Sequence, residues 1–267
     1  MDKVTSKDGT PIAFDRLGEG PPVIVVCGAM CDRALMRPTA EELAKHFTVI
    51  NYDRRGRGDS GDTTPYAVER EIEDLGALVA EAGETASVYG HSSGAVLAAH
   101  AAAAGLPIAK VVLYEPPFSP DEEEWRRLSC EYGENLRTIL SEDRRGDAVE
   151  LFMTMVGTPQ EMVDQMREES WWAGIEALAP TLAYDSEIMG DIARGGTIPT
   201  DVVGDVSVPA LVLCGGASPD WMIEVGRQLA GALPDGRHSV LAGQEHAVSP
   251  EVLVPVLKSF FSDSPVP

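Results

Sequence analysis

A serine flanked by glycines occupies residues 90–94, Gly90-His91-Ser92-Ser93-Gly94. The run follows a β-type segment, residues 87–89, and opens an alanine-rich segment, residues 94–104, that predicts a helix. A serine in such a sharp turn takes a strained backbone conformation that lifts its hydroxyl clear of the sheet. Glycines two positions away on either side leave room for strand and helix to pack closely. The pattern predicts that Ser92 is a nucleophile at a helix N-terminus, where developing negative charge is favoured.

A serine nucleophile needs a base, and four of the five histidines are poor candidates. His46 precedes a strand on the far side of the sheet, His100 lies within the alanine-rich segment, and His238 opens a strand. His91 adjoins Ser92, but successive side chains at a sharp turn are expected to diverge. His246 lies in a loop after the last predicted strand, at the carboxyl edge where open α/β sheets build their sites. We therefore expect His246 to be the base.

A second motif follows the strand predicted at residues 47–52 and reads Asp53-Arg54-Arg55-Gly56-Arg57-Gly58-Asp59-Ser60. Together with the serine motif, it resembles the α/β-hydrolase superfamily, and the resemblance covers nearly the whole chain. The resemblance implies a mainly structural loop in which Asp53 pairs with Arg55. Arg54 and Arg57 are expected to be solvated, as most arginines are. The superfamily also places its base in the loop that holds His246.

The acid of a Ser-His-acid triad has two candidates. The superfamily usually carries an aspartate three residues past the glycine that ends the penultimate strand, where this chain has Ser218. Asp220 lies two residues further on, where it would also suit the first turn of a helix. Glu115 ends the strand that follows the nucleophile's strand, and two prolines come directly after it. We prefer Glu115 and keep Asp220 as the alternative, because both satisfy the chain order serine, acid, histidine.

An oxyanion hole needs two backbone N–H groups that point at the developing charge. We expect one from Ser93, the residue after the nucleophile. The other is expected from Ala29, in the turn Cys27-Gly28-Ala29-Met30 after the third strand. Many relatives have histidine at the position of Cys27, but the donor is a backbone group and survives that change.

The remaining pattern predicts an α/β fold that positions these residues. A hairpin is expected at residues 4–16, because Asp8-Gly9 is a tight-turn signal. β-branched strands then alternate with amphipathic helices, which favours a mostly parallel central sheet flanked by helices, the α/β-hydrolase fold. The alternation stops after Glu115 and resumes near residue 210. We expect a core domain of residues 1–115 and 201–267, with an inserted all-helical cap at residues 116–200. Its predicted helices are 121–140, 147–156 and 160–172.

The charge and the composition of the chain exclude some classes of binding partner. The chain has 267 residues and a formal net charge of −22. Within residues 116–200, 18 Asp and Glu against 7 Lys and Arg give −11. Such an acidic surface repels phosphate backbones and anionic membranes, so we expect neither nucleic acid nor membrane as a partner. Cys27 and Cys31 lack a second ligand pair, and no nucleotide motif occurs, so neither metal nor cofactor is expected.

The start of the chain lacks a signal-peptide pattern, and no run of 18 apolar residues occurs. We expect a reduced, cytoplasmic protein, monomeric or homodimeric, with a frayed end at residues 262–267.

These residues together predict a serine hydrolase that acts on an ester, thioester or similar acyl bond. Tryptophans and methionines of the cap that line the cleft would imply a small, partly apolar substrate. The serine argues against haloalkane dehalogenase or epoxide hydrolase chemistry, for which relatives use aspartate. A C–C hydrolase, lyase, perhydrolase or cyclase stays open, because a fold does not fix a function. A ligand-binding receptor on the same fold is the other alternative.

Overall fold

The computed structural model describes residues 1–262, and most of the predicted frayed end lies outside them. The chain forms two compact units. The first comprises Met1–Phe118 and the chain from Ile198 onward, and the second is Ser119–Thr197. The sequence placed the helical insertion at residues 116–200.

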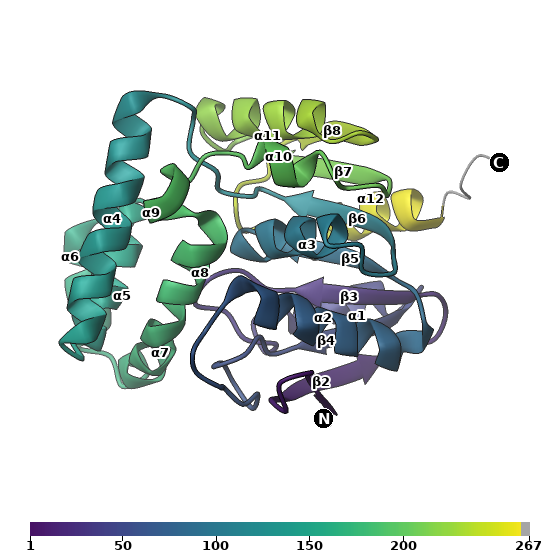
Figure 1. Ribbon diagram of the computed structural model, residues 1–267, viewed down its shortest axis with the longest axis horizontal. Coiled ribbons are helices and arrows are strands. Elements are labelled where there is room, and N and C mark those ends of the chain that lie inside the picture. Colours follow the sequence, from purple (N-terminus) through teal and green to yellow (C-terminus); the bar gives the residue numbers. More distant parts are fainter. Residues whose placement is uncertain (263–267) are drawn as a thin grey trace. The chain divides into compact units, whose positions relative to one another are not determined.

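The first unit contains an eight-stranded sheet with the order β1-β2-β4-β3-β5-β6-β7-β8 (Figure 1). β1 and β2 form the predicted N-terminal hairpin, and β2 also pairs antiparallel with β4. All other pairs are parallel. This mostly parallel sheet confirms the predicted fold class. The strands are β1 (Asp2–Thr5), β2 (Pro11–Leu17), β3 (Pro22–Val26), β4 (Thr48–Tyr52), β5 (Ala86–His91), β6 (Ile108–Tyr114), β7 (Ala210–Gly215) and β8 (Gly236–Leu241).

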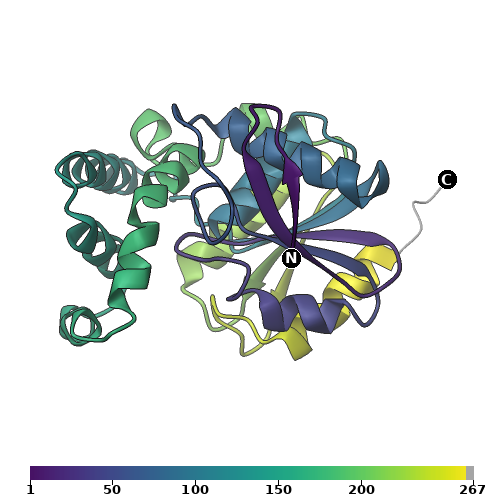
Figure 2. The ribbon, with the colours of Figure 1, turned by 90° about the horizontal axis from the view of Figure 1, so that it is seen from below.

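Helices cover both faces of this sheet, which explains why its central strands are apolar without alternation. Helices α1 (Arg37–Leu43) and α12 (Pro250–Ser262) lie on one face (Figure 2). Helices α2 (Val68–Gly83) and α3 (Ser93–Ala103) lie on the other. Helix α11 (Asp220–Ala232) packs on β7 and β8, and the short α10 (Thr200–Val203) contacts α3 and α11.

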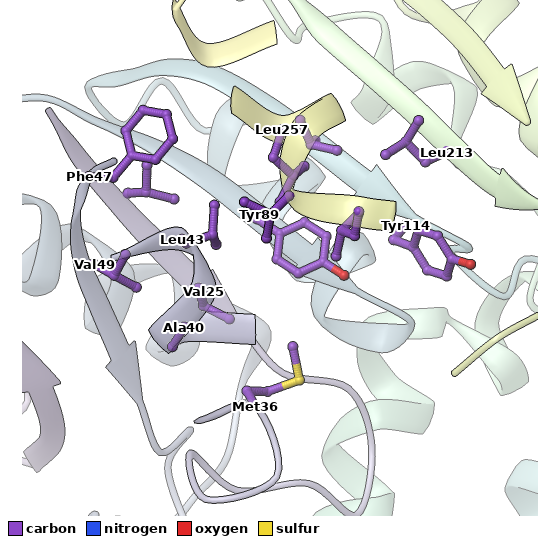
Figure 3. Packing of buried hydrophobic residues seen from close by; sticks show 14 of the residues in the cluster. Val25, Met36, Ala40, Leu43, Phe47, Val49, Tyr89, Tyr114, Leu213 and Leu257 are labelled. Carbon is purple, nitrogen blue, oxygen red and sulfur yellow. The ribbon is translucent and has the colours of Figure 1, made fainter. Parts of the chain in front are cut away.

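The face covered by α1 and α12 contains the main apolar cluster (Figure 3). Residues of β3 to β8 point into it, such as Val23 and Val25, which alternate along β3 and are almost fully buried. Ala40 and Leu43 of α1 meet Leu257 of α12 there. The sequence analysis did not predict α1, although Ala40 and Leu43 are spaced as one helical face and Pro38 suits a first turn.

The second unit is all helical. Its helices are α4 (Glu123–Ser141), α5 (Arg145–Met155), α6 (Gln160–Arg167), α7 (Trp172–Leu178), the 3-10 turn Ala179–Thr181, α8 (Leu182–Met189) and α9 (Asp191–Arg194). The single helix predicted at residues 160–172 was wrong, because the chain turns between α6 and α7. That turn lays the Arg167 guanidinium over the Trp172 ring, 5.8 Å from its centroid. Among the apolar residues of this unit, Trp172 and Met189 are buried, whereas Trp171 is exposed.

No helix within residues 1–262 combines the length and apolar character that a membrane span requires.

Candidate active site

Ser92 lies between β5 and α3 with φ 56° and ψ −128°, a conformation that is strained for any residue with a side chain. Its N–H donates to the Tyr114 carbonyl of β6 at 2.9 Å, and its own carbonyl accepts from Ala95 N at 2.9 Å. The turn is therefore tied both to the neighbouring strand and to the helix it opens. These contacts hold the Ser92 side chain at the carboxyl edge of the sheet.

Two glycines let β3 approach this turn. A Cβ on Gly94 would lie 2.4 Å from the carbonyl oxygens of both Val26 and Cys27. A Cβ on Gly28 would lie 2.9 Å from Ser92 Cβ and 3.5 Å from Ser92 Oγ. The turn after β3 thus packs directly against the serine, and Gly94 allows the close packing of strand and helix that the glycine spacing indicated.

Glu115 follows β6 with φ 43° and is completely buried. Its Oε2 accepts from His246 Nδ1 at 2.7 Å. Its Oε1 accepts from Gly215 N at 2.7 Å and from Ser218 Oγ at 2.6 Å. Burial alone would raise the pKa of this carboxyl, but the hydrogen bonds from His246, Ser218 and Gly215 outweigh it and hold the pKa below its ordinary value. Glu115 is therefore a carboxylate at neutral pH.

The structure brings Glu115 to His246, whereas Asp220 is exposed in the first turn of α11. Ser218 occupies the position where relatives usually carry the acid, and here its hydroxyl donates to Glu115 instead. No role for Ser218 was predicted from the sequence. The sequence around Ser218 could not indicate this role, because its hydrogen-bond partner, Glu115, lies 103 residues away along the chain.

The loop that carries His246 is anchored on both sides. Tyr114 Oη donates to the Glu245 carbonyl at 2.6 Å, and Ala217 N donates to the Gln244 carbonyl at 2.9 Å. The His246 side chain is 46% exposed, so one side of the imidazole is open to a substrate. Within residues 1–262, Ser92 Oγ and His246 share no hydrogen bond. Catalytic hydrogen bonds of this kind often tighten only in the substrate complex.

His91 also belongs to this cluster, which the sequence analysis did not expect. Its ring stacks on Tyr114 at 5.3 Å between centroids, and it lies 4.9 Å from the His246 ring. The expected divergence of side chains at the turn therefore does not carry His91 away from the base. Burial, together with the charge of a protonated His246, lowers the pKa of His91 to about 3. His91 is thus a neutral neighbour of His246.

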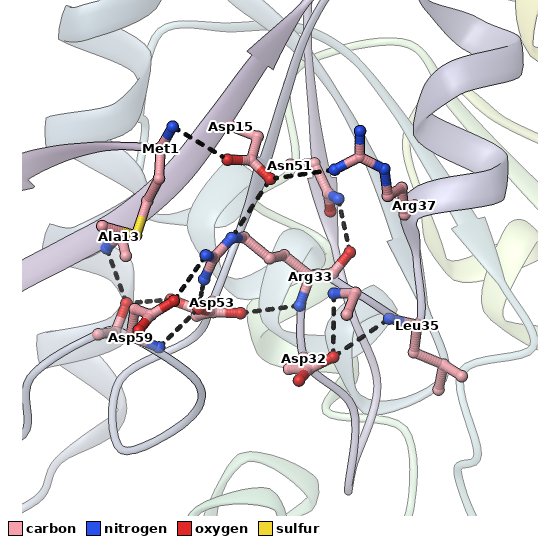
Figure 4. A network of polar contacts seen from close by, with 12 residues as sticks. Met1, Ala13, Asp15, Asp32, Arg33, Leu35, Arg37, Asn51, Asp53 and Asp59 are labelled. Carbon is pink, nitrogen blue, oxygen red and sulfur yellow. Dashed lines mark hydrogen bonds and ion pairs between the residues drawn. The ribbon is translucent and has the colours of Figure 1, made fainter.

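The loop after β4 is held differently from the predicted Asp53–Arg55 pair. Asp53 accepts from the backbone N–H groups of Arg33 and Asp59, both at 2.8 Å, and pairs with the Arg33 guanidinium (Figure 4). Arg55 points toward α2 and pairs with Asp74 at 2.7 Å and with Asp8 at 3.0 Å. The predicted pairing was wrong because each side chain finds its partner on another element.

Arg54 and Arg57 are buried, which corrects the expectation that they are solvated. Arg54 forms a two-pronged ion pair with Glu71 of α2, at 2.7 and 2.8 Å. Its Nη1 also reaches Ser93 Oγ at 3.2 Å and the Cys27 carbonyl at 3.4 Å. Arg57 Nη1 donates to the Gly28 carbonyl at 2.5 Å and reaches the Cys31 carbonyl at 3.4 Å. Both guanidinium groups therefore contact backbone carbonyls of the turn after β3, which packs against Ser92.

The two predicted oxyanion donors flank the serine. Ser93 is the first residue of α3 and follows Ser92 directly, so its N–H lies at the helix N-terminus. Ala29 follows Gly28 in the turn after β3, and it is half-buried. No group of three His, Cys, Asp or Glu side chains suited to hold a metal ion occurs in the described part of the chain.

Comparisons with known proteins identify the family and the fold of the chain. Residues 23–254 match the alpha/beta hydrolase family. An α/β hydrolase from Sphaerobacter thermophilus is 50% identical, with a TM-score of 0.87 over 98% of this chain and all of its own. A thermophilic esterase from Thermogutta terrifontis shares the fold at 23% identity, with a TM-score of 0.67 over 97% of each chain.

A curated relative is the (E)-2-((N-methylformamido)methylene)succinate hydrolase of Acinetobacter baylyi. It is 23% identical over 93% of each chain. The fold and the site together define a hydrolytic enzyme. The chain belongs to the α/β hydrolase family, as its two motifs indicated.

Proposed function

We propose that this enzyme is a serine hydrolase that cleaves an ester, thioester or similar acyl bond through an acyl-enzyme. Ser92 is the nucleophile, His246 the general base and Glu115 the acid of the triad. The observation that carries the proposal is the 2.7 Å hydrogen bond between Glu115 and His246, which lie beside a strained serine.

The reaction proceeds in two halves. Ser92 Oγ attacks the substrate carbonyl while His246 Nε2 takes the hydroxyl proton, and the leaving group departs with that proton. Water then attacks the acyl-enzyme with His246 as base, and Ser92 is regenerated. Glu115 holds Nδ1–H and so keeps Nε2 free to accept a proton. The Ala29 and Ser93 N–H groups stabilise the oxyanion of each tetrahedral intermediate.

The electrostatics of the cluster support these roles. Glu115 is ionised and buried, so it stabilises the imidazolium that forms during the attack. His91 stays neutral because its pKa is about 3, and it therefore adds no second positive charge beside His246. A protonated His91 would oppose protonation of the base.

The helical unit Ser119–Thr197 is proposed as the cap of the site. Along the chain, it connects the end of β6, which carries Glu115, to β7, which ends at Gly215 beside that carboxylate. Its tryptophans and methionines favour a small, partly apolar substrate.

The Acinetobacter relative favours a second candidate. Its name describes hydrolysis of a succinate that bears an N-methylformamido-methylene group. The same triad and oxyanion donors would serve hydrolysis of an amide-type acyl bond, because the tetrahedral intermediate is alike.

The test combines labelling with turnover. A fluorophosphonate probe should label the wild-type chain at Ser92 but not the Ser92→Ala variant, and p-nitrophenyl acetate or butyrate should be hydrolysed only by the former. A panel of small formamides and enamides, assayed in parallel, distinguishes the second candidate. If Ser92→Ala retains the wild-type turnover of every substrate that the enzyme accepts, the serine hydrolase proposal is refuted.

A further inference from the structure

We propose that Arg57, assisted by Arg54, is a positioning residue of the oxyanion hole. It fixes the peptide whose N–H group stabilises the reacting oxygen. The inference rests on the proposed function, because it assigns a supporting residue to the same site.

One peptide bond links Arg57 to the proposed oxyanion donor Ala29. The Gly28–Ala29 bond is trans, so its C=O and N–H groups point in opposite directions. Arg57 Nη1 donates to the Gly28 carbonyl at 2.5 Å. Holding the oxygen of a planar peptide fixes the direction of the N–H at its other end, which belongs to Ala29. The Gly28 carbonyl therefore cannot rotate without breaking its hydrogen bond to a buried cation.

Arg54 holds the preceding peptide in the same way. Its Nη1 reaches the Cys27 carbonyl at 3.4 Å and Ser93 Oγ at 3.2 Å. One guanidinium therefore contacts both segments that supply the oxyanion donors: the turn after β3 and the start of α3. The ion pair with Glu71 keeps that guanidinium in place.

The turn itself needs such support. Met30 has φ 55°, a left-handed conformation that is costly for a residue with a long side chain. Gly28 contributes no side chain that could hold the turn. Arg57 reaches the carbonyls of both Gly28 and Cys31, and so spans the strained residue from either side.

The chemistry of the contact adds to its geometry. A hydrogen bond from a charged donor is stronger than one between neutral groups, and it polarises the peptide that accepts it. Polarisation of the Gly28 carbonyl leaves the Ala29 N–H more positive. Both arginines are fully buried, so the surrounding water screens this effect little.

The experiment compares Arg57→Met and Arg57→Lys with a matched control, Arg55→Met. Arg55 is an equally buried arginine of the same loop, but its hydrogen bonds go to Asp8, Asp74 and the Arg70 carbonyl rather than to the turn after β3. The readouts are kcat and KM for p-nitrophenyl butyrate and the inhibition constant of phenylboronic acid. Its tetrahedral adduct with the serine places an oxygen in the oxyanion hole.

We expect Arg57→Met to lower kcat by about 10- to 100-fold, with KM within threefold, as for a displaced catalytic group. The inhibition constant of phenylboronic acid should rise by a similar factor. Arg57→Lys keeps one charged donor, so its kcat and its affinity for phenylboronic acid should lie between those of Arg57→Met and the wild type. Arg55→Met should leave kcat and boronic acid affinity within twofold in its folded fraction, although it loses thermal stability.

Two results would overturn the inference. One is a folded Arg57→Met enzyme with kcat and boronic acid affinity within twofold of wild type. The other is an equal loss of both in Arg55→Met. If Arg57→Met does not fold, Arg57→Lys decides alone, with at least a threefold parallel loss expected and no loss refuting the proposal. Failure of the proposed function is distinguishable, because the wild type itself would then resist fluorophosphonate labelling at Ser92.

Discussion

Replacing Glu115 by glutamine exchanges one carboxylate oxygen for an NH2 group. The hydrogen-bond partners of the carboxylate decide which oxygen is exchanged. Gly215 N and Ser218 Oγ donate to Oε1, and a backbone N–H can only donate. The glutamine oxygen must therefore take the place of Oε1. Its NH2 group is then forced into the place of Oε2, facing His246 Nδ1, which lay 2.7 Å from the carboxylate. An amide donor at that position selects the tautomer in which Nδ1 is bare and Nε2 carries the proton.

The magnitude follows from two losses. The base is held in the wrong tautomer, and the imidazolium loses the buried negative charge that stabilises it. Substitution of a triad carboxylate by its amide costs about 10⁴ in kcat where it has been studied, or about 5 kcal/mol of transition-state stabilisation. We expect Glu115→Gln to lower kcat by about 10³- to 10⁴-fold, with KM changed little, because the residue does not touch the substrate.

The assay is stopped-flow hydrolysis of p-nitrophenyl butyrate, together with the rate of fluorophosphonate labelling of Ser92. Asp220→Asn is the matched control, since it makes the same chemical change at an exposed carboxylate. Its kcat should stay within twofold of wild type. Circular dichroism and thermal melting establish that both variants are folded. A folded Glu115→Gln enzyme with more than a tenth of the wild-type kcat, or a collapse of turnover in Asp220→Asn alone, would refute the assignment of the acid.

Two further predictions concern pH. Ser218→Ala removes a hydrogen bond to ionised Glu115, so kcat should fall about 3- to 30-fold and stability by about 1.5–3 kcal/mol at pH 7. Because the folded pKa of Glu115 is depressed, this stability difference should be full above pH 4.5 and shrink as the pH falls through the folded pKa; thermal melts that show the same difference at every pH would contradict it.

Asp191, in the helical unit, has its pKa raised from 3.8 to about 6 by burial, which outweighs the hydrogen bonds from Ser129 and Ser186. Folding therefore loses stability as the pH rises through that interval. Asp191→Asn should gain up to about 3 kcal/mol at pH 8 and nothing at pH 4, and an equal change in melting temperature at both pH values would exclude the explanation.

The features that sequence reasoning identified are local ones. The strained turn at Ser92 could be predicted because a strand, two glycines and a helix follow one another directly along the chain. His246 could be placed because it alone among the histidines falls between the last strand and the last helix. The alternation of strands and helices likewise predicted the fold, since each element carries its own periodicity. The sheet topology confirms that prediction.

What the sequence left open depends on contacts between distant elements. Glu115 and Asp220 both follow strands at the same edge, and only the packing shows that one is buried against His246 while the other faces solvent. Arg54 was misread for a related reason. An arginine after a strand is usually solvated, but here Glu71 of α2 supplies the countercharge that makes burial tolerable.

The position of Glu115 directly after β6 has a consequence for how the proposed triad responds to heat. Ser92 and Glu115 follow β5 and β6, neighbouring strands whose separation of about 4.8 Å is set by the hydrogen-bond ladder. Ser92 and Glu115 each come directly after the last residue of a strand, whereas His246 lies further along the loop between β8 and α12. On heating, we therefore expect the His246 imidazole to be displaced before Ser92 and Glu115 are. Hydrogen bonds from Tyr114 and Ala217 help to anchor that loop, and we expect their loss on heating to move His246 away from Ser92 while the sheet is still intact.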